Sequence, residues 1–380
     1  MDYVIVNKKE VRQNREMRKA QKAAKRKYGR SRMAAPKLRV SKIVGLQAQD
    51  FISFVPMKDN VSEKKADVPS ITSAEQLITA VEQAGLTGLS GNGFSTAEKL
   101  RTLQDTNAAK RYLIINAVEC DPGLIHDEWL LENHYEEVKK GIEVLENSFS
   151  FERTFLASRL IGGYIDGKIE LVKVPNRYPM GQEKVLIHSM LGAEFAKDEI
   201  PAQHGILVIN LQTVFMIGKI AEGTYQTGSR YLTAANLDTA EAMVIEATAG
   251  MDAAEIAEKV FPDIETGIQK AGKKVFIGGG SMSAHPLTDG EQITAATNWI
   301  AYGRQADYSQ AVNCKGCGGC TGKCPAGVDV KNIIRLTERG QKDGFEKFHP
   351  EQCIGCGACT YVCAAGKNTQ EVIARINGKI

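Results

Sequence analysis

The fold of the carboxyl-terminal part of the chain is decided by two stretches, NCKGCGGCTGKCPAG at residues 313–327 and QCIGCGACTYVCAAG at residues 352–366. Together they hold eight of the nine cysteines in the 380-residue sequence. Each stretch reads C-x2-C-x2-C-x3-C, the spacing that binds [4Fe-4S] clusters in bacterial two-cluster ferredoxins. The spacing therefore predicts two [4Fe-4S] clusters and a role in carrying electrons.

In ferredoxins of this type the fourth cysteine of each run binds the cluster held by the other run. Crossed ligation predicts one cluster on Cys314, Cys317, Cys320 and Cys363, and the other on Cys353, Cys356, Cys359 and Cys324. A pair of zinc sites and a disulfide framework are the alternatives. Zinc sites usually join two C-x2-C units across a longer spacer, and disulfide frameworks are typical of short secreted chains, so neither alternative fits two runs of four. The second run lacks the proline that follows Cys324, because Cys363 is followed by Ala364, and we expect this change to alter loop geometry or potential before it abolishes binding.

The composition is that of a folded protein with more than one domain. Hydrophobic residues make up 43% of the chain and charged residues 24%, which is enough apolar mass for two or three packed domains. The sequence shows no secretory signal and no apolar run long enough to cross a bilayer. We therefore expect a cytoplasmic protein with reduced cysteines, associated with a membrane only through a complex.

Basic residues are concentrated in a segment near the amino terminus. Residues 8–32 hold twelve Lys or Arg against only Glu10 and Glu16, although the whole chain has a formal net charge of +3. The remainder is acidic, because +3 minus the +10 of this segment leaves −7. The segment has no apolar stripe to bury, so it is either a solvated arm or an element that docks on an acidic protein surface. We do not expect it to bind nucleic acid.

Between this arm and the cysteine runs, the sequence alternates between strand and helix patterns. Short apolar runs predict strands at residues 111–117, 154–157, 169–174 and 205–210. Helical periodicity predicts helices at residues 127–147 and 182–191, and a glycine-rich loop at residues 85–96 leads into a helix that contains Lys99. This order predicts a parallel, doubly wound sheet, whose ligands bind outside the carboxyl ends of the strands.

Four loops at those strand ends carry a recognisable set of motifs. They are Gly93-Phe94-Ser95-Thr96, Asn116 with Glu119-Cys120-Asp121-Pro122, Tyr178 to Glu183, and Asn210 with Thr213. In this order, and followed by a two-cluster module, they resemble the FMN- and NADH-binding flavoprotein subunit of respiratory complex I. They resemble still more closely the C subunit of the Rnf ion-translocating electron-transport complex and its soluble relatives. The resemblance covers roughly residues 70 to 365.

The resemblance implies an FMN site, with NADH as the electron donor. The glycines would let the flavin ring approach the backbone, Lys99 would neutralise phosphate or ribityl oxygens, and Phe94 would stack on the nicotinamide. The residues implied as cofactor-binding are Gly88, Gly91, Gly93, Phe94, Lys99, Asn116, Glu119, Glu183, Asn210 and Thr213. No side chain is implied as an acid–base catalyst. Each of these residues also has a structural alternative as a helix cap, a turn residue or part of the core.

The resemblance also implies the domain order and the function. A basic arm at residues 1–36 would precede a Rossmann-like α/β flavin domain at residues 37–222, an SLBB-like β-grasp module at residues 223–290 and an α+β ferredoxin-like domain at residues 291–380. NADH would reduce FMN, and the clusters would pass electrons to other subunits of a complex. The alternatives are a dedicated shuttle that serves a partner reductase or corrinoid enzyme without oxidising NADH, and a flavin-free adaptor subunit.

Overall fold

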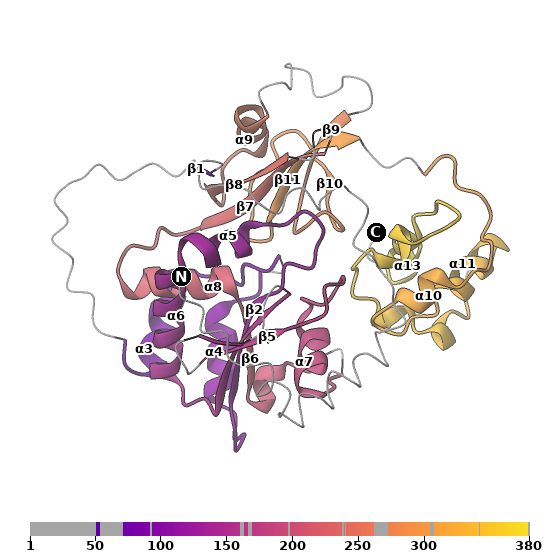
Figure 1. Ribbon diagram of the computed structural model, residues 1–380. Helices are drawn as coiled ribbons and strands as arrows, with labels where there is room; N and C mark the ends of the chain where they lie inside the picture. Colours follow the sequence, from indigo (N-terminus) through magenta and orange to yellow (C-terminus); the bar gives the residue numbers. More distant parts are fainter. Residues whose placement is uncertain are drawn as a thin grey trace.

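Two sheets and a separate helical module make up the described part of the chain (Figure 1). The computed structural model describes residues 51–53, 71–91, 93–159, 163–165, 169–196, 198–237, 239, 241–261, 273–304, 308–341 and 343–378. The predicted basic arm lies outside the described residues.

The first sheet has five strands in the order β4-β5-β3-β2-β6. Their bounds are β2 Tyr112–Ala117, β3 Arg153–Ser158, β4 Gly163–Ile165, β5 Ile169–Lys173 and β6 Ile206–Asn210. All neighbours pair in parallel except β4, which is antiparallel to β5. The chain runs from β2 outward to β5 and then returns to the other side of β2 for β6. The strand order therefore reverses between β2 and β6, where ligands of open α/β sheets usually bind.

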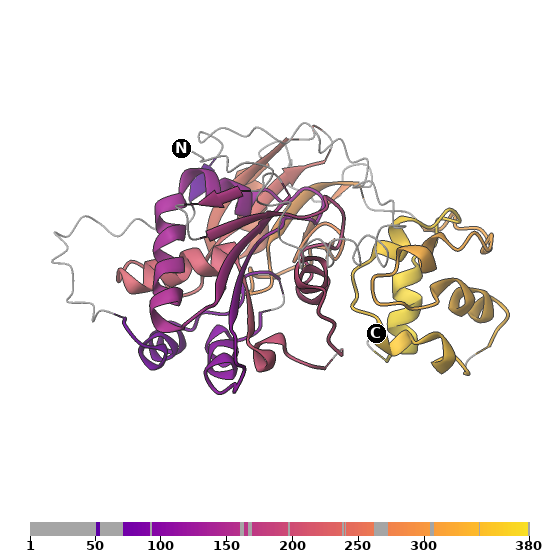
Figure 2. The same cartoon turned by 60° about the horizontal axis from the view of Figure 1, so that its bottom comes forward.

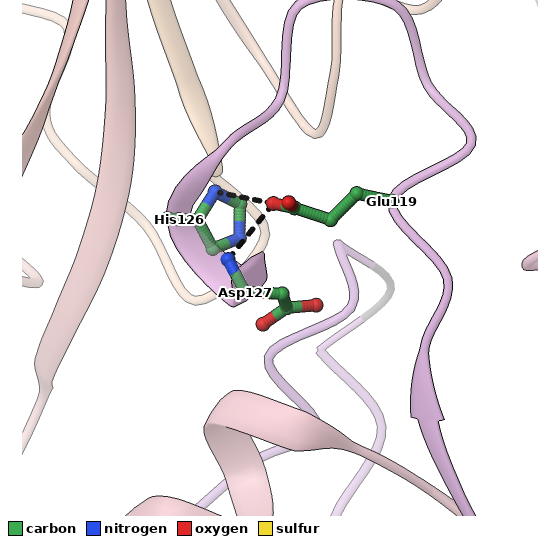
Figure 3. A group of neighbouring side chains, drawn as sticks. All are labelled: Glu119, His126 and Asp127. Carbon is green, nitrogen blue, oxygen red and sulfur yellow. Dashed lines mark hydrogen bonds and ion pairs between the residues drawn. The ribbon is translucent and has the colours of Figure 1, made fainter. Parts of the chain in front are cut away.

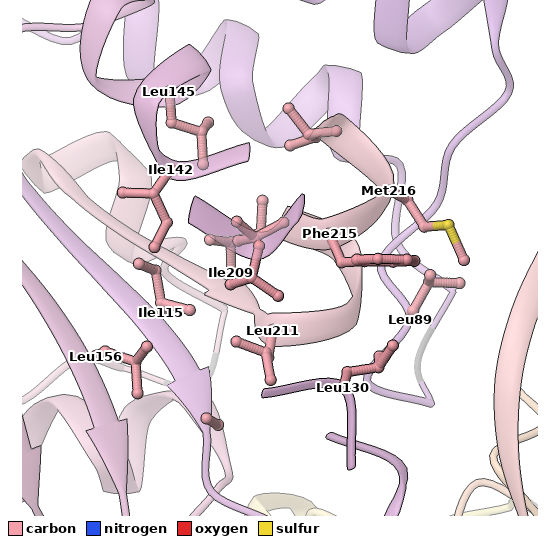
Figure 4. Packing of buried hydrophobic residues seen from close by; sticks show 14 of the residues in the cluster. Leu89, Ile115, Leu130, Ile142, Leu145, Leu156, Ile209, Leu211, Phe215 and Met216 are labelled. Carbon is pink, nitrogen blue, oxygen red and sulfur yellow. The ribbon is translucent and has the colours of Figure 1, made fainter. Parts of the chain in front are cut away.

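Helices cover both faces of this sheet, and each face has its own hydrophobic core. Side chains alternate along β2, so Leu113 and Ile115 enter one core and Ile114 enters the other. The larger core lies under four helices, α3 Ala74–Gln83, α4 Thr96–Gln104, α6 Tyr135–Ser148 and α8 Leu211–Ala221, and Figure 4 shows part of it. The smaller core lies under α7 Glu183–Leu191. The four strands predicted from the sequence are confirmed, within one or two residues at their ends.

Helices α6 and α8 pack with their backbones in close contact because each presents a glycine to the other. A Cβ at Gly141 would lie 1.9 Å from the carbonyl oxygen of Val214, and one at Gly218 would lie 2.6 Å from that of Glu137. No larger residue fits at either position without separating the helices. This packing holds α8 against the sheet, and with it Asn210, where β6 passes directly into α8.

The single helix predicted at residues 127–147 was wrong, because the structure has two helices there. Helix α5 covers His126–Asn133, and α6 begins at Tyr135. At His134 the backbone leaves the helical region, with φ −131° and ψ 35°. The His134 ring packs against Trp129 and Phe215, with ring centroids 5.1 and 5.5 Å away. The apolar spacing continues through this break, so periodicity alone does not show it.

The second sheet has six strands in the order β1-β8-β7-β11-β9-β10. Their bounds are β1 Phe51–Ser53, β7 Ser229–Asn236, β8 Glu241–Thr248, β9 Lys273–Gly278, β10 His285–Pro286 and β11 Trp299–Arg304, and helix α9 Ala253–Val260 shares a core with them. Strands β1 and β11 come from outside the predicted range 223–290, since β1 pairs with β8 and β11 pairs with both β7 and β9. The sheet thus draws strands from three parts of the chain.

The cysteine runs lie in a helical module beside the two sheets (Figures 1 and 2). Its helices are α10 Gly319–Lys323, α11 Val330–Glu338, α12 Ala358–Tyr361 and α13 Thr369–Ile376. The two halves repeat one hydrogen bond: the Thr321 hydroxyl accepts the N–H of Lys331 at 2.8 Å, and the Thr360 hydroxyl accepts that of Gln370 at 2.9 Å. Within residues 308–341 and 343–378 no strand is assigned, so the α+β character predicted for this module is not seen there.

Candidate cofactor sites

A cavity of about 350 Å³ opens at the switch point of the first sheet. Its wall contains eight of the ten predicted cofactor-binding residues: Gly88, Gly91, Phe94, Lys99, Asn116, Glu183, Asn210 and Thr213. The other residues that line it are Ser90, Ser95, Thr96, Leu100, Gly181, Gln182, Leu207, Val208, Ile209 and Ile354. The resemblance-based residues therefore converge on one site from four separate loops.

Two asparagines of this wall lie at the ends of adjacent strands. Asn116 on β2 is paired with Asn210 on β6 in the parallel ladder. The Asn116 amide donates to the carbonyl oxygen of Gly181 at 2.8 Å. The side-chain oxygen of Asn210 caps α8 by accepting the N–H groups of Gln212 and Thr213 at 3.0 and 3.4 Å. Both asparagines are thus fixed by the fold before any ligand arrives.

One ion pair crosses the cavity wall. The Lys99 ammonium on α4 lies 2.8 Å from a carboxylate oxygen of Glu183 on α7, and it also donates to the carbonyl oxygen of Val208 at 3.1 Å. Both side chains remain partly accessible, at 20% and 29%. The lysine is therefore held near the cavity by an acid and can still meet an anionic ligand.

The glycine-rich loop folds back on itself at the mouth of the cavity. The Gly88 N–H donates to the carbonyl oxygen of Phe94 at 2.7 Å, and the Leu89 N–H donates to the Thr213 hydroxyl at 3.0 Å. Gly91 has φ +94°, and a Cβ there would lie 3.3 Å from the Cα of Gly279 in the second sheet domain. Phe94 remains 37% exposed at the rim, as a residue that stacks on an incoming ring would.

The hydroxyl of Thr96 is the clearest sign that the cavity is built for a polar ligand. Thr96 is 3% exposed and lines the cavity, yet its hydroxyl oxygen is buried with no hydrogen-bond partner. Buried polar groups are rarely left without one. Beside it, Ser95 caps α4 by accepting the N–H of Glu98 at 3.2 Å. Bare glycine backbone, an orphan hydroxyl and a lysine together fit the ring, ribityl chain and phosphate of FMN.

Gly93 and Glu119, the other two predicted residues, are not brought to the cavity wall. Glu119 is 3% exposed, and its two carboxylate oxygens accept the N–H groups of Asp127 and Glu128 at 2.8 and 3.0 Å, at the start of α5. It therefore holds the helix that follows β2. Gly93 lies in the irregular part of the glycine-rich loop before α4, with φ +63°.

Glu119 also belongs to a buried group of three titratable side chains (Figure 3). Its carboxylate lies 3.7 Å from Nδ1 of His126, and Asp127 accepts a 2.7 Å hydrogen bond from the Asn210 amide. Burial raises the pKa of Glu119 well above its usual value and raises that of Asp127 to about 7, while burial lowers the pKa of His126 to about 3. The imidazole is thus neutral. The group connects the cavity residue Asn210 to the start of α5.

The cysteines divide into two groups that match crossed ligation. Cys314, Cys317, Cys320 and Cys363 line one small cavity. Cys324 lies in the other group, because it and Cys353 are near enough to Cys359 to add to the rise of its thiol pKa, which burial raises to about 11. Burial likewise raises the pKa of Cys356 to about 12, with Cys359 and Cys324 among its neighbours. Thiolates that are costly to bury alone are stabilised by bound metal, so both groups fit [4Fe-4S] clusters.

The second cysteine run lies against the flavin cavity. Ile354, the residue after Cys353, is part of the cavity wall. The Tyr178 hydroxyl donates to the carbonyl oxygen of Cys356 at 2.6 Å. A Cβ at Gly357 would lie 2.7 Å from the carbonyl oxygen of Met282, so the loop also touches the second sheet domain. We call the Cys324/Cys353/Cys356/Cys359 group the proximal cysteine group and the other the distal cysteine group.

Some site residues were not predicted individually from the sequence. Thr96 belongs to the Gly93-Phe94-Ser95-Thr96 motif but was not named as a cofactor-binding residue, and Ile354, between two cluster cysteines, reaches the cavity only through tertiary structure. Ser95 lies in the Gly93-Phe94-Ser95-Thr96 motif but was not named as a site residue. The spacing of Ser95 and Glu98, together with the helix that follows, was a signal for the cap that the structure shows.

Two family profiles match the chain at the two sites just described. Residues 81–219 match the Nuo51 FMN-binding domain, and residues 313–367 match the 4Fe-4S dicluster domain. These matches and the geometry define the class: the chain is an iron–sulfur flavoprotein, with an FMN-binding domain followed by a two-cluster ferredoxin module. The curated proteins that it matches are named as C subunits of ion-translocating oxidoreductase complexes, so the chain is Rnf C-subunit-like, as the resemblance predicted.

Two of these relatives show how far the similarity extends. The C subunit of the Na⁺-translocating ferredoxin:NAD⁺ oxidoreductase complex of Acetobacterium woodii is 27% identical over 72% of this chain and 63% of its own length. The C subunit of the ion-translocating oxidoreductase complex of Edwardsiella ictaluri is 29% identical over 78% of this chain and 38% of its own length. The chain thus spans less than two thirds of the relatives it matches.

Solved structures agree on the fold. The NAD⁺-reducing [NiFe]-hydrogenase in its H₂-reduced state matches with a TM-score of 0.57 and 17% identity, over 82% of this chain and 64% of that one. Its air-oxidised state matches with a TM-score of 0.56 and 16% identity, over the same shares of the two chains. Among the helices that the structure describes, none has the length and apolar character needed to span a bilayer.

Proposed function

We propose that this protein takes electrons from NADH at an FMN in the switch-point cavity and passes them through its two clusters to a partner protein. One observation carries the order of the relay: the proximal cysteine group is joined to the cavity wall by Ile354 and by the Tyr178–Cys356 hydrogen bond. The distal cysteine group lines a separate cavity, none of whose lining residues belongs to the flavin cavity. Electrons would therefore pass from the flavin to the proximal and then to the distal cluster.

The chain's own residues supply binding, orientation and exclusion of water. When bound, FMN accepts a hydride and the clusters carry single electrons. Lys99 and the Thr96 hydroxyl would bind anionic and hydroxyl groups of FMN, and Asn116 and Asn210 would shape the wall against which it lies. Phe94 at the rim would receive the nicotinamide. Buried Tyr178 and Ala358, with Met282 packed against them, form an apolar contact that keeps water out between the flavin domain and the proximal group.

We further propose that the second sheet and α9 form an SLBB-like β-grasp spacer. Its role here is mechanical. The Asp121 carboxylate, in the loop after β2, accepts the Ser281 hydroxyl at 2.7 Å and the Met282 N–H at 3.3 Å. Met282 in turn contacts the proximal cysteine loop at Gly357. The spacer would thus hold the flavin domain and the ferredoxin module in a fixed relation.

The names of the relatives supply the proposed setting. Both are subunits of oxidoreductase complexes that move ions, so we propose that this protein works as a subunit of a membrane-associated electron-transfer complex. The predicted basic arm would then dock on an acidic surface of another subunit.

Anaerobic titration of the reconstituted protein with NADH tests this function. The proposal predicts that substoichiometric NADH bleaches the flavin absorption and then reduces iron–sulfur absorption. Dithionite serves as the positive control for reducible clusters. Flavin that is bound but not bleached by NADH would favour the dedicated shuttle, and protein with clusters but no flavin affinity would favour the adaptor.

A further inference from the structure

We infer that the face of the ferredoxin module around the distal cysteine group docks a small, acidic, one-electron carrier protein. The inference rests on the proposed function in one respect, since it takes the distal cluster as the outer end of the relay. It adds the surface and the charge of the partner, which the sequence motifs do not specify.

The distal group is open to solvent on the side away from the sheets. Cys317 is exposed, and in Figures 1 and 2 α11 lies at the edge of the molecule remote from both sheets. Tyr308 and Val312, just before the first cysteine run, are 41% and 51% exposed. The Val312 N–H donates to the carbonyl oxygen of Ala365, so this apolar segment lies beside the end of the second run. These two exposed apolar side chains, just before the first cysteine run, would supply the apolar part of the contact surface.

The charge around this patch is positive. Lys315, Lys331 and Lys367 line the distal cavity with its four cysteines, and no carboxylate does. Arg335 follows Lys331 by one helical turn on α11. Lys315, Lys331 and Arg335 form no ion pair with any other residue that the structure describes. These cations are therefore available to a partner.

The carboxylates near this surface form hydrogen bonds or ion pairs within the ferredoxin module. Glu338 pairs with Lys367 at 2.7 Å and accepts the Cys314 N–H at 2.9 Å. Asp329 caps α11 and binds the Thr321 hydroxyl at 3.0 Å. Glu371 pairs with Arg375 on α13. Glu338 thus neutralises Lys367, and the nearby Arg335 helps to lower the pKa of Glu338. Lys315 and Lys331 on the cavity wall, with the exposed Arg335, carry the remaining positive charge that would attract an acidic surface.

A basic rim around a small apolar patch is typical of transient electron-transfer contacts. Such interfaces are small and weak, and charge complementarity raises their rate of encounter more than their lifetime. The same cations also offset the negative charge of a thiolate-bound cluster, so an experiment must separate docking from a change in cluster potential.

The test measures electron transfer from pre-reduced protein to two carriers of opposite charge. Holoprotein is reduced with dithionite, freed of excess reductant and mixed in a stopped-flow instrument with an acidic [2Fe-2S] ferredoxin or with basic cytochrome c. This design bypasses NADH, so a failure of the proposed NADH oxidation does not affect the result. The variants are R335E and K315E/R335E, with K140E on α6 as a control of equal charge change on the far side of the flavin domain.

We expect the rate with acidic ferredoxin to fall about tenfold in R335E at low salt, and further in K315E/R335E. High salt should reduce the wild-type rate to that of the variants. The K140E rate should match wild type, and cytochrome c should not be slowed by R335E. Equal rates in wild type and R335E at low salt would overturn the inference, as would a loss fully explained by a shifted cluster potential. Stronger binding to anionic phospholipid vesicles than to ferredoxin, lost in R335E, would also overturn it by assigning the face to a membrane.

Discussion

The hydroxyl of Tyr178 donates a 2.6 Å hydrogen bond to the backbone carbonyl oxygen of Cys356, across 178 residues of sequence. Tyr178 precedes the cavity-lining residues Gly181, Gln182 and Glu183, so one short segment touches both cofactor sites. A further hydrogen bond anchors this segment to the loop after β2: the Gly181 N–H donates to the Cys120 sulfur at 3.1 Å. The ninth cysteine is therefore a structural partner of this loop.

Replacing Tyr178 with Phe should loosen the proximal cluster selectively. The variant leaves the Cys356 carbonyl without its partner in a buried contact, at a cost of about 1–3 kcal/mol. We expect release of iron to a chelator to become biphasic, with one half of the iron released several-fold faster than in wild type and the other half unchanged. Uniform acceleration of both halves would show general destabilisation and contradict a local role.

Replacing Thr96 with Val should weaken FMN binding without destabilising the protein. The variant removes a hydroxyl that has no partner in the protein but would bind the flavin, so it loses a ligand hydrogen bond worth about 0.5–1.5 kcal/mol. We expect FMN affinity, measured by flavin fluorescence quenching, to fall about three- to tenfold, while the thermal midpoint of the flavin-free protein stays the same or rises. T96S should restore affinity. Unchanged affinity in T96V would remove Thr96 from the FMN site.

Replacing Gly91 with Ala should disturb the cavity, whereas the same replacement at Gly250 should not. Gly91 and Gly250 share φ +94°, but a Cβ at Gly250 meets nothing within 4 Å, whereas one at Gly91 meets Gly279. Both G91A and G250A should lose about 1–2 kcal/mol of stability from backbone strain. Only G91A should also lose FMN affinity, by about tenfold or 1.4 kcal/mol. Equal FMN affinity in the two variants would contradict the close approach seen at Gly91.

The buried group around Asp127 should make stability depend on pH. Burial raises the folded-state pKa of Asp127 to about 7, so the folded protein holds this proton more tightly than the unfolded chain does. The resulting contribution to the free energy of unfolding is full below pH 3.8, the ordinary pKa, and is lost as the pH rises through 7. Glu119 acts in the same direction. His126, with a pKa lowered by burial to about 3, acts in the opposite direction below its ordinary value of 6.5.

Between pH 6.5 and 8 the carboxyl effects should therefore dominate. We expect the apparent thermal midpoint, measured anaerobically at a fixed scan rate, to fall by a few degrees over this range in wild type. D127N keeps an oxygen for the Asn210 amide and should flatten the profile. A wild-type midpoint that rises from pH 6.5 to 8 would contradict this account.

The sequence predicted those parts of the fold that are set by residues close to one another along the chain. Apolar runs predicted β2, β3, β5 and β6, and cysteine spacing predicted the grouping of the ligands. Long-range pairing was not predictable in this way. Strand β11 joins β7 across more than sixty residues, and nothing local in Trp299–Arg304 selects that partner over the ferredoxin module.

The candidate site shows the same division. Motif residues such as Asn116 and Asn210 reached the cavity, because strand ends of a parallel sheet meet at one edge. Glu119 was expected at the flavin, but two backbone N–H groups of α5 bind its carboxylate. Ile354 enters the wall only because the ferredoxin module packs against the flavin domain, a contact that no local pattern encodes.

The order of the relay is tested most directly by removing one cluster at a time. The double variant C314A/C317A should keep the proximal cluster and C353A/C356A the distal one, each with about four irons per chain. After anaerobic mixing with NADH, rapid-freeze EPR should detect a reduced cluster in C314A/C317A on the wild-type timescale. In C353A/C356A the flavin should bleach normally while the remaining cluster stays oxidised. Prompt cluster reduction in C353A/C356A, with none in C314A/C317A, would contradict the proposed order.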